Sequence, residues 1–148
     1  MTLHHFILVL HLIAATIWVG GHLTLSIVFL PVSLRKKDPN IILNFERKFE
    51  PLGMTALITL VITGIWMAYD FNVTTEKWFS FSSGFEKVIS TKLLLLFLTF
   101  ICALIAQFKI IPNLTQYNLK KMAVLIVCVT LLAVSMLVLG STLRYGGI

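Results

Sequence analysis

The chain has 148 residues, of which 58% are hydrophobic and only 12% are charged, and its mean hydropathy is +0.96. Soluble domains carry about 25% charged residues, so the composition excludes a soluble globular protein and predicts an integral membrane protein. The net charge of +6 does not indicate a nucleic-acid partner, because the basic residues cluster at the ends of apolar segments, next to membrane lipid.

The first predicted element runs from Thr2, a suitable N-cap, to Leu30 before Pro31. Between His4 and Leu30 it contains no carboxylate, lysine or arginine, and about 20 apolar residues suffice to span a bilayer core. No basic segment precedes it and no small-residue cleavage site follows it. We therefore expect an uncleaved transmembrane helix rather than a signal peptide.

A basic segment follows at 35–40, and the alternating apolar and charged residues at 41–50 predict a short helix lying in the membrane interface. Pro51 suits the first turn of a second transmembrane helix, which we expect to reach Tyr69. Hydroxyl residues recur every four positions on it, at Thr55, Thr59 and Thr63. Such spacing is typical of close helix packing in lipid.

Two more apolar segments follow a polar and aromatic loop at 70–84. They predict helices over 87–111, before Pro112, and over 121–143. The connections are short and no linker separates domains. We therefore predict a single all-α membrane domain over 1–148, folded as a four-helix up-and-down bundle.

The positions of lysine and arginine predict the orientation. The first and third connections carry Arg35, Lys36, Lys37, Arg47, Lys48, Lys109, Lys120 and Lys121. The second connection and the C-terminal tail carry only Lys77, Lys87 and Arg144. Because basic connections stay in the cytoplasm, we expect a multi-pass protein of the inner cell membrane with both termini outside.

All histidines of the chain lie on the first helix, at His4, His5, His11 and His22. At about 100° per residue, His4, His11, Trp18 and His22 fall within about 20° of one line along that helix. A ligand-capable stripe inside a membrane indicates a functional site, since imidazole binds transition metals and haem iron. His4, His11 and His22 are therefore candidate metal ligands. The alternative is a set of structural histidines hydrogen bonded to neighbouring helices.

Other residues could complete such a site. We expect Lys92 at the depth of His11. Its ammonium group either extends to the membrane interface or neutralises an acidic ligand such as a porphyrin propionate. Arg144 could also neutralise such a ligand. Thioethers bind Cu(I) and haem iron, although core packing is their commoner role. The candidate thioethers are Met67 and Met136 at the outer level and Met54 and Met122 at the inner level. Cys102 and Cys128 lie inside apolar runs, where we expect small buried hydrophobic side chains rather than a disulfide.

Several segments resemble the CopD (copper resistance protein D) domain family. They are HLIAATIWVGGHL at 11–23, FEPLGMTALITLVITGIW at 49–66, Lys92 with the run to Pro112, and LGSTLRYGG at 139–147. The resemblance covers nearly the whole chain and implies a four-helix unit of the inner membrane associated with copper uptake or tolerance. His11 with Trp18, and Lys92, are also similar to the HemJ type of protoporphyrinogen oxidase, from which the chain departs after its first helix.

Two functions stay open. In the first, His4 and His5 capture copper from a periplasmic carrier, and His11 and His22 hold it or pass it on. In the second, the protein binds haem b through His11 or His22, with Lys92 and Arg144 at the propionates, and exchanges electrons with a quinone. Only the second would make it an enzyme, a haem-dependent oxidoreductase. A purely structural subunit is the remaining alternative.

His11 and His22 are separated by roughly 16 Å along the helix, so one metal ion bonded at ~2 Å cannot reach both. Either a methionine completes each site, or a second copy supplies its own first helix. We expect a parallel homodimer, because Gly20 and Gly21 favour a close approach of helices in lipid.

Overall fold

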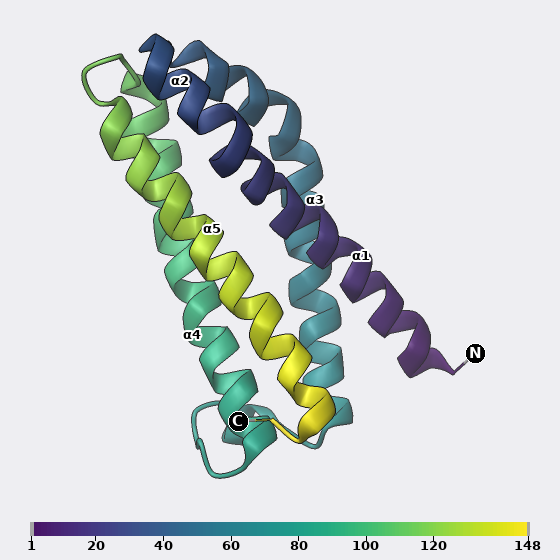
Figure 1. Cartoon of the computed structure of the whole chain (residues 1–148). Coiled ribbons are helices and arrows are strands. Elements are labelled where there is room, and N and C mark those ends of the chain that lie inside the picture. The colour runs from purple at the N-terminus through teal and green to yellow at the C-terminus, as the bar shows by residue number, and fades with distance from the viewer. Residues whose placement is uncertain (1, 148) are drawn as a thin grey trace.

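The structure, a computed structural model, describes residues 2–147. Four helical segments in it are long and apolar enough to cross a membrane, and no strand occurs within those residues. They run up and down beside one another (Figure 1), which confirms the predicted all-α four-helix bundle. Both termini lie at the end that carries the 71–83 loop, here called the terminal end. The opposite end, with the connections at 37–39 and 114–118, is called the basic end.

The first helical segment does not stop before Pro31, so that predicted boundary is wrong. α1 (Leu3–Thr24) passes into a π-helical turn, η1 (Leu25–Phe29), and then into α2 (Leu30–Lys36). The N–H of Leu30 bonds to the carbonyl of Leu25, five residues back. This wider turn accommodates Pro31, which has no N–H to donate to a normal helical turn. Thr2 caps α1 as predicted, because its hydroxyl accepts from the backbone N–H of His5.

The predicted interfacial helix at 41–50 and the second transmembrane helix are one continuous helix, α3 (Asn40–Asp70). The prediction of a separate surface helix is therefore wrong, and Pro51 lies inside α3 rather than at its start. The first turns of α3 stay in line because Ile42 is fully buried against Leu25 and Met122 in an apolar cluster at the basic end. Prolines inside helices are tolerated in membrane proteins because neighbouring groups satisfy the freed carbonyl.

α4 (Gly84–Ile105) begins three residues before the predicted start, since Ser83 and Glu86 form a reciprocal capping box there. It continues through a second π-helical turn, η3 (Ala106–Ile110), and ends in a short 3₁₀ turn that contains Pro112, close to the predicted end. The last long helix is α5 (Leu119–Thr142).

The helices form two well-packed pairs that meet through α1 and α5. α1 packs mainly against α3, α5 packs against α4, and α1 and α5 contact each other (Figure 1). A central cluster of Ala14, Trp18, Val19, Ala56 and Ala133 fills the middle of the bundle. α3 and α4 do not pack extensively against each other. A cavity lies between them in the basic half of the bundle.

Candidate functional site

The histidine stripe of α1 faces α3 of the same chain. The contacts pair His4 with Asp70, His11 with Thr63, and His22 with Phe49. The shared direction predicted from helical spacing is therefore confirmed. The three imidazoles nonetheless lie in three separate surroundings along the bundle. Since α3 already covers the stripe, a homodimer that joined two copies through it would require α3 to move away.

His4 lies at the terminal end and is held by a carboxylate. Its Nδ1–H donates to Asp70 Oδ2 over 2.7 Å, and its ring meets the ring of Phe71 edge-on. Both partners of this ion pair are substantially exposed. His4 is thus paired with Asp70 rather than with His5, and the pair ties the beginning of α1 to the end of α3.

His11 occupies the middle of the α1–α3 interface. Its Nδ1 lies 2.7 Å from Thr63 Oγ1, and the Thr63 hydroxyl itself donates to the carbonyl of Thr59 over 2.6 Å. Because the hydroxyl proton is already used, His11 Nδ1 must be the donor, which leaves Nε2 deprotonated with a free lone pair. Of the hydroxyl residues at four-residue spacing, Thr63 therefore orients a histidine, whereas Thr55 and Thr59 donate to carbonyls one turn back in α3.

Lys92 lies across the bundle from His11. Its Nζ sits against Gly140 of α5, where an added Cβ would come within 3.0 Å of it. Lys92 is half-buried, forms no ion pair with any of the described residues, and is within electrostatic range of His11. The two residues therefore lie near one level, as predicted. Arg144 is exposed in a 3₁₀ turn at the terminal end, and the structure does not bring it to this level.

Met67 and Met136, the thioethers expected at the level of His11, are half-buried on α3 and α5. Each stands one helical turn from a residue of this level, Thr63 and Gly140 respectively. Neither forms part of the cavity that surrounds His22.

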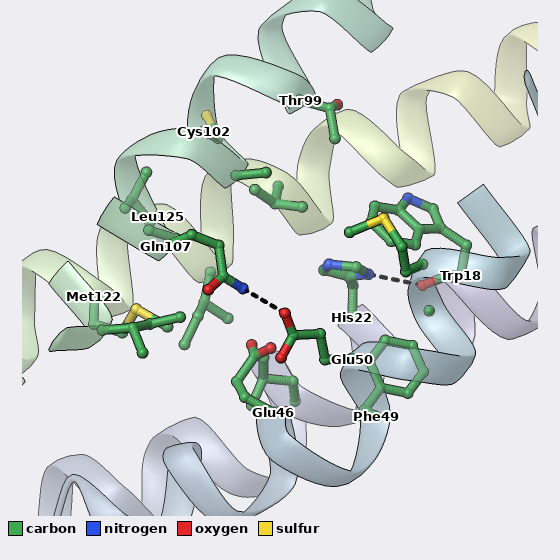
Figure 2. Close-up of a pocket in the computed structure, with 18 residues that line it drawn as sticks. Trp18, His22, Glu46, Phe49, Glu50, Thr99, Cys102, Gln107, Met122 and Leu125 are labelled. Atoms are coloured by element: carbon green, nitrogen blue, oxygen red, sulfur yellow. Dashed lines mark hydrogen bonds between the residues drawn. The ribbon is translucent and has the colours of Figure 1, made fainter. Parts of the chain in front are cut away.

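His22 lies in the cavity of the basic half (Figure 2). Its Nδ1–H donates to the carbonyl of Trp18 over 2.8 Å, and the rings of Trp18 and His22 pack with centroids 4.3 Å apart. A carbonyl can only accept, so His22 also keeps its proton on Nδ1. The other ring nitrogen points away from Trp18, on the side of Gln107 (Figure 2). An Nδ1–H bonded to a backbone carbonyl, with Nε2 free, is the arrangement that orients metal-binding histidines.

The cavity around His22 has a volume of about 120 Å³ and collects polar and sulfur-bearing side chains from three other helices. These are Glu46, Glu50 and Met54 of α3, Cys102 of α4, Gln107 of η3 and Met122 of α5. Gln107 Nε2 donates to Glu50 Oε1 over 3.1 Å and so bridges α3 and η3. The expectation that Met54 or Met122 would accompany His22 is met by both, since both line the same cavity.

Sequence reasoning missed Glu46, Glu50 and Gln107. The sequence predicts a surface helix for the two carboxylates, whereas in the continuous α3 they lie one turn apart on the face that borders the cavity. Gln107 could have indicated a polar site here, because it is an amide inside a long apolar segment. Cys102 also lines the cavity, while Cys128 is exposed, so the expectation of a buried side chain is wrong at Cys128. The buried indole N–H of Trp18 has no hydrogen-bond partner among the described residues.

Within residues 2–147, no three side chains of His, Cys, Asp or Glu lie close enough together to share a metal ion. That grouping does not include thioethers, and Met54 and Met122 line the cavity together with His22. Soft cations such as Cu(I) accept such ligands, whereas zinc is bound by imidazole, thiolate and carboxylate.

Comparison with known proteins found no matching family model, no matching curated protein and no matching solved structure. The resemblances to the CopD family and to HemJ therefore remain predictions from the residues quoted above. The function proposed below rests on the geometry of the cavity and of the histidine stripe.

Proposed function

We propose that this chain is a copper-handling protein of the inner cell membrane, with His22 as the central ligand for Cu(I) as its cargo. The observation that carries the proposal is the cavity itself, because one histidine with a free Nε2 shares it with two thioethers and a thiol. Imidazole, thioether and thiolate ligands are those that Cu(I) prefers.

Charge and size also support a metal ion at this place. A cation in the low-dielectric interior needs a compensating charge, and Glu46 and Glu50 border the same cavity. A volume of about 120 Å³ is large enough for a metal ion. The porphyrin of a haem is far larger, so a haem would require α3 and α4 to separate further at this level.

The positive-inside rule places the basic end in the cytoplasm and both termini outside. In that orientation the His22 cavity opens in the cytoplasmic half, and His11 and His4 follow on the same face of α1 towards the outside. A periplasmic copper carrier would then deliver the ion at the terminal end.

The proposal is tested by measuring Cu(I) affinity of the purified protein anaerobically, in competition with a coloured Cu(I) chelator. We expect His22→Ala to weaken binding at least tenfold, because losing even a group that only orients a metal ligand costs about 10–100-fold in affinity. Met54→Leu with Met122→Leu should also weaken it, while His5→Ala serves as the matched control because His5 is exposed and off the stripe. Equal affinity of the wild type and His22→Ala would reject this function.

A second candidate, haem b binding, is favoured by the arrangement at His11. Its Nε2 is free, and Lys92, within electrostatic range of His11, could neutralise a propionate. His11 and Lys92 pack closely against Gly64 and Gly140, where a larger residue would displace them. Bound haem would supply one-electron redox chemistry, with a quinone as the membrane partner. Purified protein with a Soret band that His11→Ala removes would favour this candidate, whereas a colourless protein that binds copper favours the first.

A further inference from the structure

A second hollow lies at the basic end, on the surface of the bundle. It is a half-open groove of about 270 Å³ between the end of α2 and the beginning of α5. Its lining consists of Leu34, Lys37, Gln116, Tyr117, Leu119 and Lys120. No carboxylate contributes to it, and the copper proposal makes no use of it.

The groove is positively charged and unneutralised. Lys37 follows α2 and Lys120 lies in the first turn of α5, so two cations from distant parts of the sequence border one hollow. The only ion pair among residues 2–147 joins His4 and Asp70 at the other end of the bundle. The first turn of α5 contains no acidic residue, and no side chain caps it, so the dipole of α5 adds positive potential, whereas the C-terminal end of α2 contributes the opposite sign.

The groove also lies at the polar boundary of the membrane. The segment Leu3–Lys36 has 34 residues, and at ~1.5 Å per residue it is longer than the ~30 Å hydrocarbon core, so its last turn reaches the headgroup level. Leu34 and Leu119 line the groove beside the two lysines, and the exposed Leu34 gives it an apolar side next to the cationic one. Tyr117, 89% exposed at the rim, adds a hydroxyl at the same level.

We propose that this groove binds the headgroup of an anionic phospholipid from the leaflet at the basic end. Lys37 and Lys120 would neutralise the phosphate, Gln116 and Tyr117 would donate hydrogen bonds to its oxygens, and the exposed Leu34 would contact the start of an acyl chain. The proposal is independent of the copper function. A phosphate with an attached acyl chain is the one ligand that uses both the cationic and the apolar sides.

The experiment compares phosphatidylglycerol and phosphatidylcholine as ligands of the purified full-length protein, with bound lipid counted by native mass spectrometry. The double variant Lys37→Gln/Lys120→Gln should bind phosphatidylglycerol roughly thirtyfold more weakly, at about fivefold per lysine near a membrane surface. Lys77→Gln/Lys87→Gln makes the same charge change at the terminal end and should bind like the wild type. Lys37→Arg/Lys120→Arg keeps both charges and should retain binding, which separates lipid loss from misfolding.

Equal weakening in the two glutamine variants would overturn the proposal, because attraction would then depend on total charge rather than on the groove. Equal retention of phosphatidylcholine and phosphatidylglycerol by the wild type would also overturn it. Glycerol phosphate provides the last arm. If it displaces the lipid at equal concentration, the site recognises a soluble phosphate and not a phospholipid.

Discussion

Gly20 and Gly21 are neighbours on α1 that meet different surroundings. An added Cβ at Gly20 would meet nothing within 4 Å, whereas one at Gly21 would overlap the ring of Phe49 from α3. Gly21 is thus used for packing inside the chain, and only Gly20 stays open for a contact between copies. Phe49 also meets the ring of His22 nearly at a right angle, so the packing at Gly21 supports the candidate ligand.

Gly21→Ala should destabilise the protein by about 1–3 kcal/mol, because the ring of Phe49 must leave its place in a packed interface. The measurement is thermal unfolding in detergent, together with Cu(I) affinity, which should fall as His22 loses its neighbour. Gly20→Ala is the matched control and should change stability by no more than about 1 kcal/mol, in the stabilising direction. A larger loss for Gly20→Ala than for Gly21→Ala would contradict the packing described.

The common direction of His4, His11 and His22 could be predicted from spacing alone, because a helix repeats every ~3.6 residues. Their partners could not. Asp70, Thr63 and Phe49 come from α3, and nothing local in the sequence sets how α3 lies against α1. The protonation of His11 on Nδ1 likewise depends on a hydroxyl 52 residues away, whose own proton is used within α3.

At the scale of elements, four apolar segments were predictable because each carries enough hydrophobic residues to span a bilayer. The two largest errors fall at prolines, Pro31 and Pro51. Pro31 and Pro112 each follow a π-helical turn by two positions, and this turn shifts the hydrogen bonds so that the missing N–H is tolerated. The helix continues past Pro31, whereas the chain leaves the helix after Pro112. A proline in the sequence does not by itself predict which of these two outcomes occurs.

The continuity of α3 through Pro51 can be measured with spin labels at Asn40 and Ile62, both exposed, in a variant with Cys102 and Cys128 replaced by serine. A continuous helix should place the two backbone sites roughly 33 Å apart, at ~1.5 Å per residue. A surface helix that turned at Pro51 would shorten this distance to about 23 Å, as two perpendicular arms do. Labels at Leu52 and Ile62 are the control, since both models place them on one straight helix. The shorter distance would return 41–50 to the membrane interface.

At the scale of the whole molecule, the His22 cavity exists because α1 and α5 form the central contact while α3 and α4 stay apart. Carboxylates near the ends of apolar segments are common, and from sequence Glu46 and Glu50 gave no sign of facing inwards. Their position follows only from the continuous α3 and from Gln107, which reaches Glu50 from the other side of the opening. The cavity is thus a tertiary feature, whereas the histidine stripe is a property of one helix.

The orientation of the bundle decides which compartment the cavity and the lipid groove face. Eight lysines and arginines lie in the helix turns and connections of the basic end, against Lys77, Lys87 and Arg144 at the terminal end. This asymmetry predicts that the basic end is cytoplasmic, because cationic loops resist translocation.

The orientation can be measured with single cysteines that replace Lys37 or Ser82 in a variant without Cys102 and Cys128. Each cysteine is reacted with a membrane-impermeant maleimide. In intact cells we expect labelling at position 82 and none at position 37, while both should label after the membrane is opened. The opened sample is the control for reactivity, since both positions are exposed. Labelling of position 37 in intact cells would reverse the bundle. The His22 cavity would then face the outside, and the route from an external copper carrier through His4 and His11 would no longer hold.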